Sequence, residues 1–437
     1  MPRRAMRPDH ELRLLKGGEQ FFPALTEAID AARAEVLLET YIFEFNGAPL
    51  AIAEALERAA ARGVAVHVVA DGVGTPDVPA EWQARWQAAG VQWRIFNPAR
   101  GWRLVVPKRW RRLHRKLCAV DGQVAFCGGI NLIDDLYDPN YGTLDKPRFD
   151  FAVRVVGPLV ADVQDTMRRL WLRLDVGHEA RRHDLGRTVE AVRAASRAGT
   201  EGASDGSAVA VPRRSLRPAA AAPAASGAPA DGALGAAPAA RRRGAIAGLV
   251  LRDNVRFRRR IEATYRLAIA QARSEILIAN AYFIPGVRLQ RALLRAARRG
   301  VRITLLLQGR YEYFMQHHAS RAVYGVLLAG GIEIIEYAPS FLHAKVAVVD
   351  GAAGSISTVG SSNLDPLSLL LAREANVFVV DDAFGAELRG HLLDAVAHEG
   401  HRVESADHLN RPFRTRCLSW LAWAMIQVAL FATGKRY

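Results

Sequence analysis

The chain has 437 residues, half of them hydrophobic and 8% aromatic, which is enough to bury a large core and excludes global disorder. Lys and Arg number 59 against 44 Asp and Glu, so the formal net charge is +15. This surplus predicts a polyanionic partner, either nucleic acid or the surface of an acidic membrane. The three cysteines (Cys118, Cys127 and Cys417) are too few for a disulfide framework and favour a reducing compartment.

The start of the chain is basic, and no apolar stretch follows it. We therefore expect neither a signal peptide nor an N-terminal membrane helix. Hydrophobic periodicity then predicts helices over residues 22–34 and 50–62, and β-branched and aromatic residues predict strands over 36–43 and 64–70. Gly63 follows the second helix, at a position where glycine commonly ends helices.

The second half of the chain repeats this order. Helices are predicted over 259–273 and 289–299, strands over 276–283 and 301–307, and Gly300 again follows the second helix. The matching segments are Ala32 to Glu39 with Ala272 to Ala279, Ala60 to Val64 with Ala297 to Val301, and His114 to Asp121 with His343 to Asp350. Such a repeat predicts two α/β units with helices on both faces of a sheet, facing each other across a pseudo-two-fold axis.

A change in composition separates the two units. Residues 216–240 contain 13 Ala, 4 Pro and 3 Gly, and so few large apolar groups do not offset the entropy lost on ordering. We expect a flexible linker between two lobes that bind each other through their own surfaces. The predicted domains are a first lobe over 9–179, the linker over 180–244, a second lobe over 245–410 and a C-terminal membrane-associated helix over 411–437.

The chemistry-bearing residues occur once in each half. His114, Lys116 and Asp121 form a His-x-Lys-x4-Asp motif that His343, Lys345 and Asp350 repeat; a glycine-containing turn with Asn131 or Asn363 follows, and then a strand that begins at Asp150 or Glu374. The residues within each motif are apolar and predict a buried strand. Because side chains two apart on a strand share a face, His and Lys are expected to point the same way.

This set of residues suits phosphoryl chemistry. Two Lys and two Asn supply donors for phosphate oxygens, one His can attack phosphorus, and the other can protonate the leaving oxygen. A carboxylate on the far nitrogen of each ring fixes its tautomer. No metal or cofactor is required, because Lys and Asn already neutralise the charge.

At these residues the sequence resembles the phospholipase D superfamily, which is marked by the duplicated His-Lys-Asp motif. The segments Val359 to Ser368 and Ala279 to Gly286 resemble bacterial cardiolipin synthases of the B type, which lack N-terminal membrane helices. The resemblance implies two α-β-α sandwich lobes that form a pseudo-dimer around one shared active site. It also implies phosphatidyl transfer through a phosphohistidine, from phosphatidylglycerol to a second lipid's hydroxyl. The long Ala- and Pro-rich linker departs from the family.

The resemblance also assigns roles to residues. His114 and His343 are the catalytic pair, with His114 the expected nucleophile, and Asp150 and Glu374 orient the two imidazoles. Lys116, Lys345, Asn131 and Asn363 are expected to hold the phosphate. Asp121 and Asp350 are grouped with the catalytic residues because they complete the motif, although in this fold they are expected to brace a loop.

The tail contains the longest apolar run. Residues 417–434 include only three polar positions, two Trp stand near their start, and basic residues flank them. As a helix, they would reach about 27 Å, marginal against a hydrocarbon core of about 30 Å. An interfacial helix at the cytoplasmic side of the inner membrane is favoured over a full span, and a helix packed on a lobe is the alternative.

Two further segments have open interpretations. Residues 100–112 carry six cations and two Trp beside the first motif, which suits anionic lipid headgroups, a nucleic-acid backbone or a solvated turn. Asp71 opens a turn that either binds a headgroup or is a plain turn.

Together these patterns predict a cardiolipin synthase acting on anionic phospholipids at a membrane surface, with no nucleic acid as partner. A phospholipase D hydrolase that makes phosphatidic acid uses the same site with water as acceptor. A basic nuclease of the same fold and a membrane scaffold without activity are further alternatives, although the first leaves the apolar tail unexplained.

Overall fold

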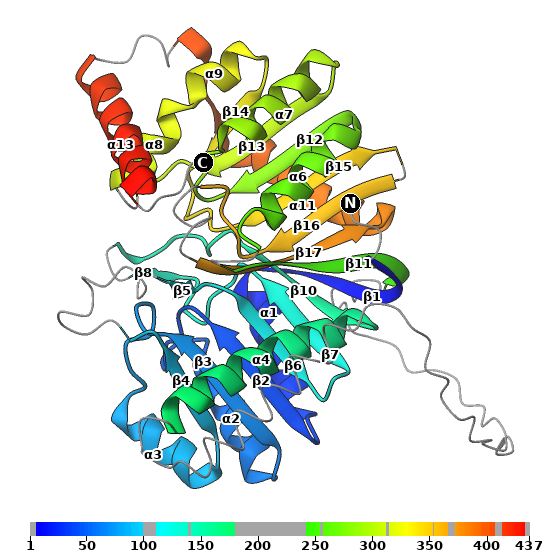
Figure 1. Cartoon of the computed structure of the whole chain (residues 1–437), viewed down its shortest axis with the longest axis vertical. Helices are drawn as coiled ribbons and strands as arrows, with labels where there is room; N and C mark the ends of the chain where they lie inside the picture. The colour runs from blue at the N-terminus through cyan, green and yellow to red at the C-terminus, as the bar shows by residue number, and fades with distance from the viewer. Residues whose placement is uncertain are drawn as a thin grey trace, which may run out of the picture. The chain divides into compact units, whose positions relative to one another are not determined.

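The computed structural model describes residues 6–98, 111–138, 141–179, 242–253, 257–311, 314–352, 354–365, 372–406 and 413–432. Two compact units are separated, one formed by residues 1–171 and 241–437 and the other by 172–240. The second unit coincides largely with the predicted linker, and its described part is the end of one helix. The first unit holds two α/β lobes whose main strands and helices follow a similar order, which confirms the predicted fold class (Figure 1).

The first lobe contains ten strands and four helices within the described residues. They are β1 (Arg7–Lys16), α1 (Gly17–Asp30), β2 (Glu35–Thr40), α2 (Leu50–Ala61), β3 (Ala65–Asp71), α3 (Ala80–Ala89), β4 (Gln92–Phe96), β5 (Arg112–Leu113), β6 (Lys116–Val120), β7 (Val124–Gly128), β8 (Tyr137–Asp138), β9 (Gly142–Thr143), β10 (Phe151–Val156) and α4 (Leu159–Glu179).

The second lobe follows the same plan and ends with an additional helix. Its elements are β11 (Arg242–Arg252), α6 (Arg260–Gln271), β12 (Ala272–Asn280), α7 (Val287–Arg298), β13 (Arg302–Gln308), α8 (Phe314–Ala322), α9 (Tyr324–Ala329), β14 (Glu333–Tyr337), β15 (Lys345–Gly351), β16 (Gly354–Gly360), β17 (Ala372–Val380), α11 (Asp382–His398), β18 (Gly400–Arg402) and α13 (Phe413–Ala432).

One mixed sheet runs through both lobes. Its order is β18-β14-β13-β12-β15-β16-β17-β11-β1-β10-β7-β6-β2-β3-β4, so β1 and β11 form the junction as antiparallel neighbours. The sequence analysis did not predict these two strands, because their partners lie far away in the chain. β1 pairs with β10 on its other side, and β11 pairs with β17. The lobes therefore share backbone hydrogen bonds as well as a surface.

The predicted elements are confirmed, with shifted ends. The strands predicted over 36–43 and 276–283 end earlier, at Thr40 and Asn280. Their last aromatic residues, Phe43 and Phe283, are buried in loops beyond the strand ends. Their burial explains why the sequence there is as apolar as a strand, although these residues are not part of a β-ladder. Gly63 and Gly300 both have φ of +87°, as expected of residues that follow a helix end.

Three apolar clusters hold the layers together. One packs α1, α2 and α3 on one face of the first lobe's sheet, and the equivalent cluster of the second lobe includes α6 and α7. The third lies on the other face beneath α4 and α11, and it continues from one lobe into the other. Because burial of apolar surface is the main stabilising term, this shared cluster joins the lobes.

Helix α13 lies against α8 at the edge of the second lobe. Ser419 and Ala422 are buried on its inner side, and Trp423 packs against the second lobe's core. Its outer side exposes large apolar residues: Leu418, Trp420, Leu421, Met425 and Val428 are 41–69% exposed. No helix within the described parts of the chain has the length and apolar character needed to cross a bilayer.

Leu12 tests the shared cluster, since it lies on β1 and is fully buried. We expect Leu12→Ala to lower the free energy of unfolding by about 2–5 kcal/mol, because a cavity remains in the core. Urea denaturation followed by circular dichroism measures this. Leu421→Ala, on the exposed side of α13, is the matched control, with an expected change within about 0.5 kcal/mol. Equal changes for the two variants would contradict the assignment of Leu12 to the shared core.

Candidate active site

The two His-x-Lys motifs begin the equivalent strands β6 and β15. Lys116 and Lys345 are buried as the first residues of these strands. The Lys116 ammonium donates to the carbonyl oxygen of His114 at 2.9 Å, and Lys345 donates in the same way to His343. Each lysine is thus turned back towards the backbone of its own histidine.

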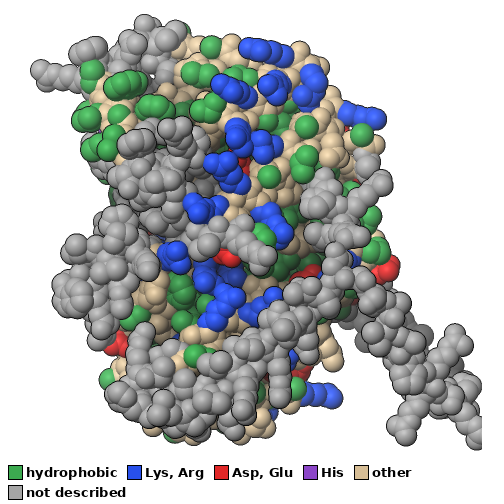
Figure 2. Space-filling model, viewed as in Figure 1, with side chains coloured by type: hydrophobic (Ala, Val, Ile, Leu, Met, Phe, Trp, Pro, Cys, Tyr) green, Lys and Arg blue, Asp and Glu red, His purple; other side chains and the backbone are tan. Residues whose placement is uncertain are grey.

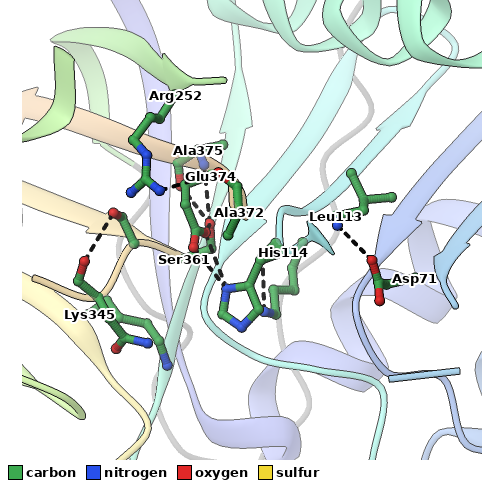
Figure 3. A network of polar contacts seen from close by, with 12 residues as sticks. Asp71, Leu113, His114, Arg252, Lys345, Ser361, Ala372, Glu374 and Ala375 are labelled. Carbon is green, nitrogen blue, oxygen red and sulfur yellow. Dashed lines mark hydrogen bonds and ion pairs between the residues drawn. The ribbon is translucent and has the colours of Figure 1, made fainter. Parts of the chain in front are cut away.

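Each histidine is paired with the carboxylate of the other lobe. His114 Nδ1 lies 3.1 Å from Glu374 Oε1, and His343 Nδ1 lies 2.6 Å from Asp150 Oδ2 (Figure 3 shows the first pair). The sequence supplied both carboxylates but not this crossed arrangement. Since each imidazole depends on a group from the partner lobe, neither lobe alone contains a complete His–carboxylate pair.

The backbone follows the same crossed pattern. The N–H of His114 donates to the carbonyl of Arg373, the residue before Glu374, at 3.0 Å. The N–H of His343 donates to the carbonyl of Phe149, the residue before Asp150, also at 3.0 Å. Each histidine is therefore fixed to the opposite lobe by its main chain and by its ring, which limits the positions that the imidazole can adopt.

The buried charges act on one another. Burial lowers the pKa of His114, and Lys116 lowers it further, whereas Glu374 opposes the decrease. Burial, Lys345 and Lys116 together hold the pKa of His343 well below its usual value. Burial also lowers the pKa of Lys116 to about 7. Burial thus shifts both imidazoles towards the neutral form, in which a ring nitrogen has a free lone pair.

The two carboxylates differ in their surroundings. Burial would raise the pKa of Glu374, but the charges of His114 and Arg252 hold it below its usual value. The hydroxyl of Ser361 also donates to this carboxylate. For Asp150, burial outweighs the effect of Lys345 and raises the pKa to about 7.

The position opposite Asp150 explains part of this difference. Gly129, in the turn after β7, is the counterpart of Ser361 in the turn after β16. A Cβ at Gly129 would lie 2.3 Å from Asp150 Oδ1. No side chain fits there, so Asp150 lacks the hydroxyl donor that Glu374 has. Its carboxylate instead accepts the N–H of Phe151 at 2.8 Å.

The two predicted phosphate-binding amides are buried in the turns after β7 and β16. Asn131 Oδ1 accepts the N–H of Ile42 at 3.4 Å. Asn363 is 3% exposed, and its Oδ1 has no hydrogen-bond partner within the described structure. Asn131 is thus the better fixed of the two amides, and phosphate binding by either one stays a prediction.

Asp121 and Asp350 lie away from the histidines, at the other ends of their strands. Four residues lie between each of them and its Lys, so the step of five residues along the strand spans about 17 Å at the usual rise per residue. Asp121 accepts the N–H groups of Arg33, Ala34 and Glu35 at 2.8 Å each, and Asp350 accepts from the hydroxyl of Ser274. Their contacts are those of residues that brace a loop, and a direct part for them in the reaction stays a prediction.

Sequence reasoning missed three residues around the first histidine. Tyr41 places its ring 5.0 Å from the His114 imidazole and 5.5 Å from the Lys116 ammonium. Ser361 and Arg252 support Glu374. A comparison of the two repeats would have found Ser361, because it replaces a glycine, whereas nothing in the sequence connects Arg252 with a residue 122 positions later. The basic segment 100–112 lies outside the described residues except for its last two positions.

The crossed pair can be tested without a substrate. Because the charge of Glu374 raises the pKa of His114, Glu374→Gln is expected to lower that pKa further while keeping a hydrogen-bond acceptor. NMR titration of the imidazole C–H signals measures this, with His10 as an internal reference and Glu81→Gln as a surface control. An unchanged pKa of His114 in Glu374→Gln would argue against the pair.

Comparison with known proteins agrees with this architecture. A family model described as "Cardiolipin synthase, PLD-like domain" matches residues 25–144 and 265–394. Cardiolipin synthase B of Escherichia coli K12 is 34% identical over 91% of this chain and 83% of its own length, and cardiolipin synthase A of Pseudomonas fluorescens is 29% identical over 91% and 71%. The crystal structure of phosphatidylserine synthase from Haemophilus influenzae superposes with a TM-score of 0.61 at 13% identity, covering 97% of this chain and 96% of that one. With both halves matched and each half carrying the His-x-Lys motif, the chain belongs to the phospholipase D-like cardiolipin synthase family.

Proposed function

We propose that this protein synthesises cardiolipin by transferring a phosphatidyl group from one phosphatidylglycerol to the hydroxyl of another, with release of glycerol. The observation that carries the proposal is the single buried site in which two histidines, each paired with the other lobe's carboxylate, lie beside two lysines. The family membership and the relatives named cardiolipin synthase support this choice of reaction.

In the first half-reaction, His114 is proposed to attack phosphorus through Nε2. A phosphorus–nitrogen bond forms, the phosphorus–oxygen bond to glycerol breaks, and the leaving oxygen takes, from His343, the proton that the His343–Asp150 pair holds. Glu374 is suited to be the partner of the nucleophile His114. A carboxylate that stays ionised stabilises the positive charge that develops on the His114 ring. Asp150, with a pKa of about 7, is the weaker ionic partner and suits the histidine that moves the proton.

In the second half-reaction, the hydroxyl of another phosphatidylglycerol replaces glycerol. His343 takes the proton from this hydroxyl, its oxygen attacks phosphorus, and the bond to His114 breaks. Lys116 and Lys345 neutralise the phosphate oxygens in both steps, with the assistance of Asn131 and Asn363. The near-symmetry of the two lobes suits a reaction in which the entering and leaving alcohols exchange places.

Product analysis on phosphatidylglycerol vesicles tests the reaction. Cardiolipin and glycerol are expected in equal amounts, and His114→Ala and His343→Ala are each expected to reduce transfer by at least about 10³-fold, because both steps need both rings. Thin-layer chromatography and mass spectrometry identify the products. Phosphatidic acid without cardiolipin would replace the synthase by a hydrolase, and full activity in either variant would refute the shared site.

We further propose that the enzyme acts as a peripheral protein at the cytoplasmic face of the inner membrane. The exposed apolar side of α13 supports insertion at a lipid interface, where Trp side chains are favoured. Cations support attraction to anionic lipid: Arg288, Arg291, Arg295 and Arg298 are exposed along α7, and Figure 2 shows Lys and Arg gathered over this helix and near the lobe junction.

Trp420 and Leu421 are suited to a test of this surface, since they are 69% and 55% exposed. Replacing both by Glu is expected to reduce sedimentation with phosphatidylglycerol vesicles at least about tenfold, because charged groups enter the interface at a cost. Activity on detergent-dispersed lipid should change little. Leu267→Glu, at an exposed apolar position of α6, is the matched control. Unchanged sedimentation of the α13 variant would exclude this helix as the membrane contact.

A further inference from the structure

A second pair of equivalent hydrogen bonds holds the residue before each histidine. The N–H of Leu113 donates to Asp71 Oδ2 at 2.7 Å, and the N–H of Leu342 donates to Gln308 Oε1 at 2.8 Å (Figure 3 shows the first bond). Asp71 and Gln308 are the last residues of the equivalent strands β3 and β13. Both lobes therefore have this bond to the residue before the histidine. Its acceptor is a carboxylate in the first lobe and an amide in the second.

Both acceptors are buried, and Asp71 is held on several sides. Asp71 is 0% exposed, and its other oxygen accepts the N–H of Val73 at 2.8 Å and Nη1 of Arg112 at 3.3 Å. A buried carboxylate with these donors links the end of β3 to β5 and does not face outwards as a headgroup contact would. The plain-turn interpretation of Asp71 is thus closer to the structure, but the turn carries a specific link to the motif.

The link matters because the regular strand pairing before each histidine is short. Within the described part of the chain, strand β5 has two residues, and they pair with Ala372 and Arg373 of β17. In the second lobe, an isolated bridge between Leu342 and Phe149 takes the same place. Without the side-chain acceptor, the N–H before each histidine would be buried and unpaired, which destabilises the local backbone conformation.

We propose that Asp71 and Gln308 are positioning residues for the two histidines, and that the carboxylate of Asp71 additionally supports anion binding by Lys116. The positioning part follows from the two bonds and their burial. The electrostatic part follows from the difference between the lobes, since a carboxylate lies beside the first motif where the second has an amide. Only the rate measurements below rest on the proposed function.

The charges around Lys116 set the direction of the effect. Glu374, Asp150 and Asp71 raise the pKa of Lys116, whereas burial and Lys345 lower it, and the result is about 7. The His114 carbonyl and the Tyr41 ring also face this ammonium. Removing the charge of Asp71 therefore lowers the pKa of Lys116, so that the cation is lost at a lower pH.

Amide hydrogen exchange tests the positioning part without any substrate. Asp71→Asn and Gln308→Glu keep an acceptor, whereas Asp71→Leu and Gln308→Met remove it with similar size. We expect the Leu113 amide to exchange at least about tenfold faster in Asp71→Leu than in Asp71→Asn, and the Leu342 amide to respond in the same way to Gln308→Met. Equal protection in all four variants, measured on protein whose circular dichroism is unchanged, would overturn the assignment.

Sulfate binding against pH tests the electrostatic part, because sulfate keeps its charge over the whole titration. Calorimetry is expected to show that binding weakens as pH rises through the pKa of Lys116, and that this weakening moves to lower pH in Asp71→Asn. Asp162→Asn, which removes a surface partner of Arg7, should leave the curve unchanged. Identical curves for the Asp71→Asn variant and the unaltered protein would refute the proposed charge effect.

Turnover of phosphatidylglycerol adds a readout that separates the proposals. The alkaline limb of kcat/KM should move to lower pH in Asp71→Asn, and Asp71→Leu should reduce kcat by more than Asp71→Asn does. A chain that fails to make cardiolipin but shows the exchange and sulfate results would refute the proposed function and leave the positioning role intact.

Discussion

The crossed pairing of each histidine with the other lobe's carboxylate is the constraint on which the rest of the structure depends. An imidazole that serves as nucleophile or acid must keep one tautomer, and the group that fixes it lies across the lobe junction. The backbone bonds from His114 to Arg373 and from His343 to Phe149 bring the two strand ends together. The shared sheet and the shared apolar cluster then keep this junction closed.

Duplication supplied a symmetric frame, and a few substitutions made its halves unequal. Ser361 stands where the first half has Gly129, and Gln308 stands where it has Asp71. Ser361 adds a hydrogen-bond donor to Glu374, the partner of His114, and Asp71 adds a negative charge beside the residue that precedes His114. The histidine beside the ionised Glu374 is therefore the better supported as a cation, although the two motifs are nearly identical in sequence.

The sequence analysis succeeded where the information is local. The motif at His114 and its copy at His343, the glycines after the helices and the α/β alternation all follow from short-range pattern, and these identified the fold class. The crossed partners, the strands β1 and β11 and the link from Arg252 to Glu374 depend on contacts between residues far apart in the chain. The resemblance placed Asp121 with the catalytic residues because it completes the motif, and a motif does not show how far one end of a strand lies from the other.

The position of β1 in the middle of the sheet has a consequence for biosynthesis. When the ribosome has made only the first lobe, β11 does not yet exist, and β1 is an edge strand with unpaired N–H and C=O groups along one side. The N-terminal half must therefore wait until β11, the strand that covers β1, has been synthesised. During that interval the exposed edge fits the β11 of any neighbouring copy as well as its own, so this arrangement carries an intrinsic route to exchange of lobes between chains.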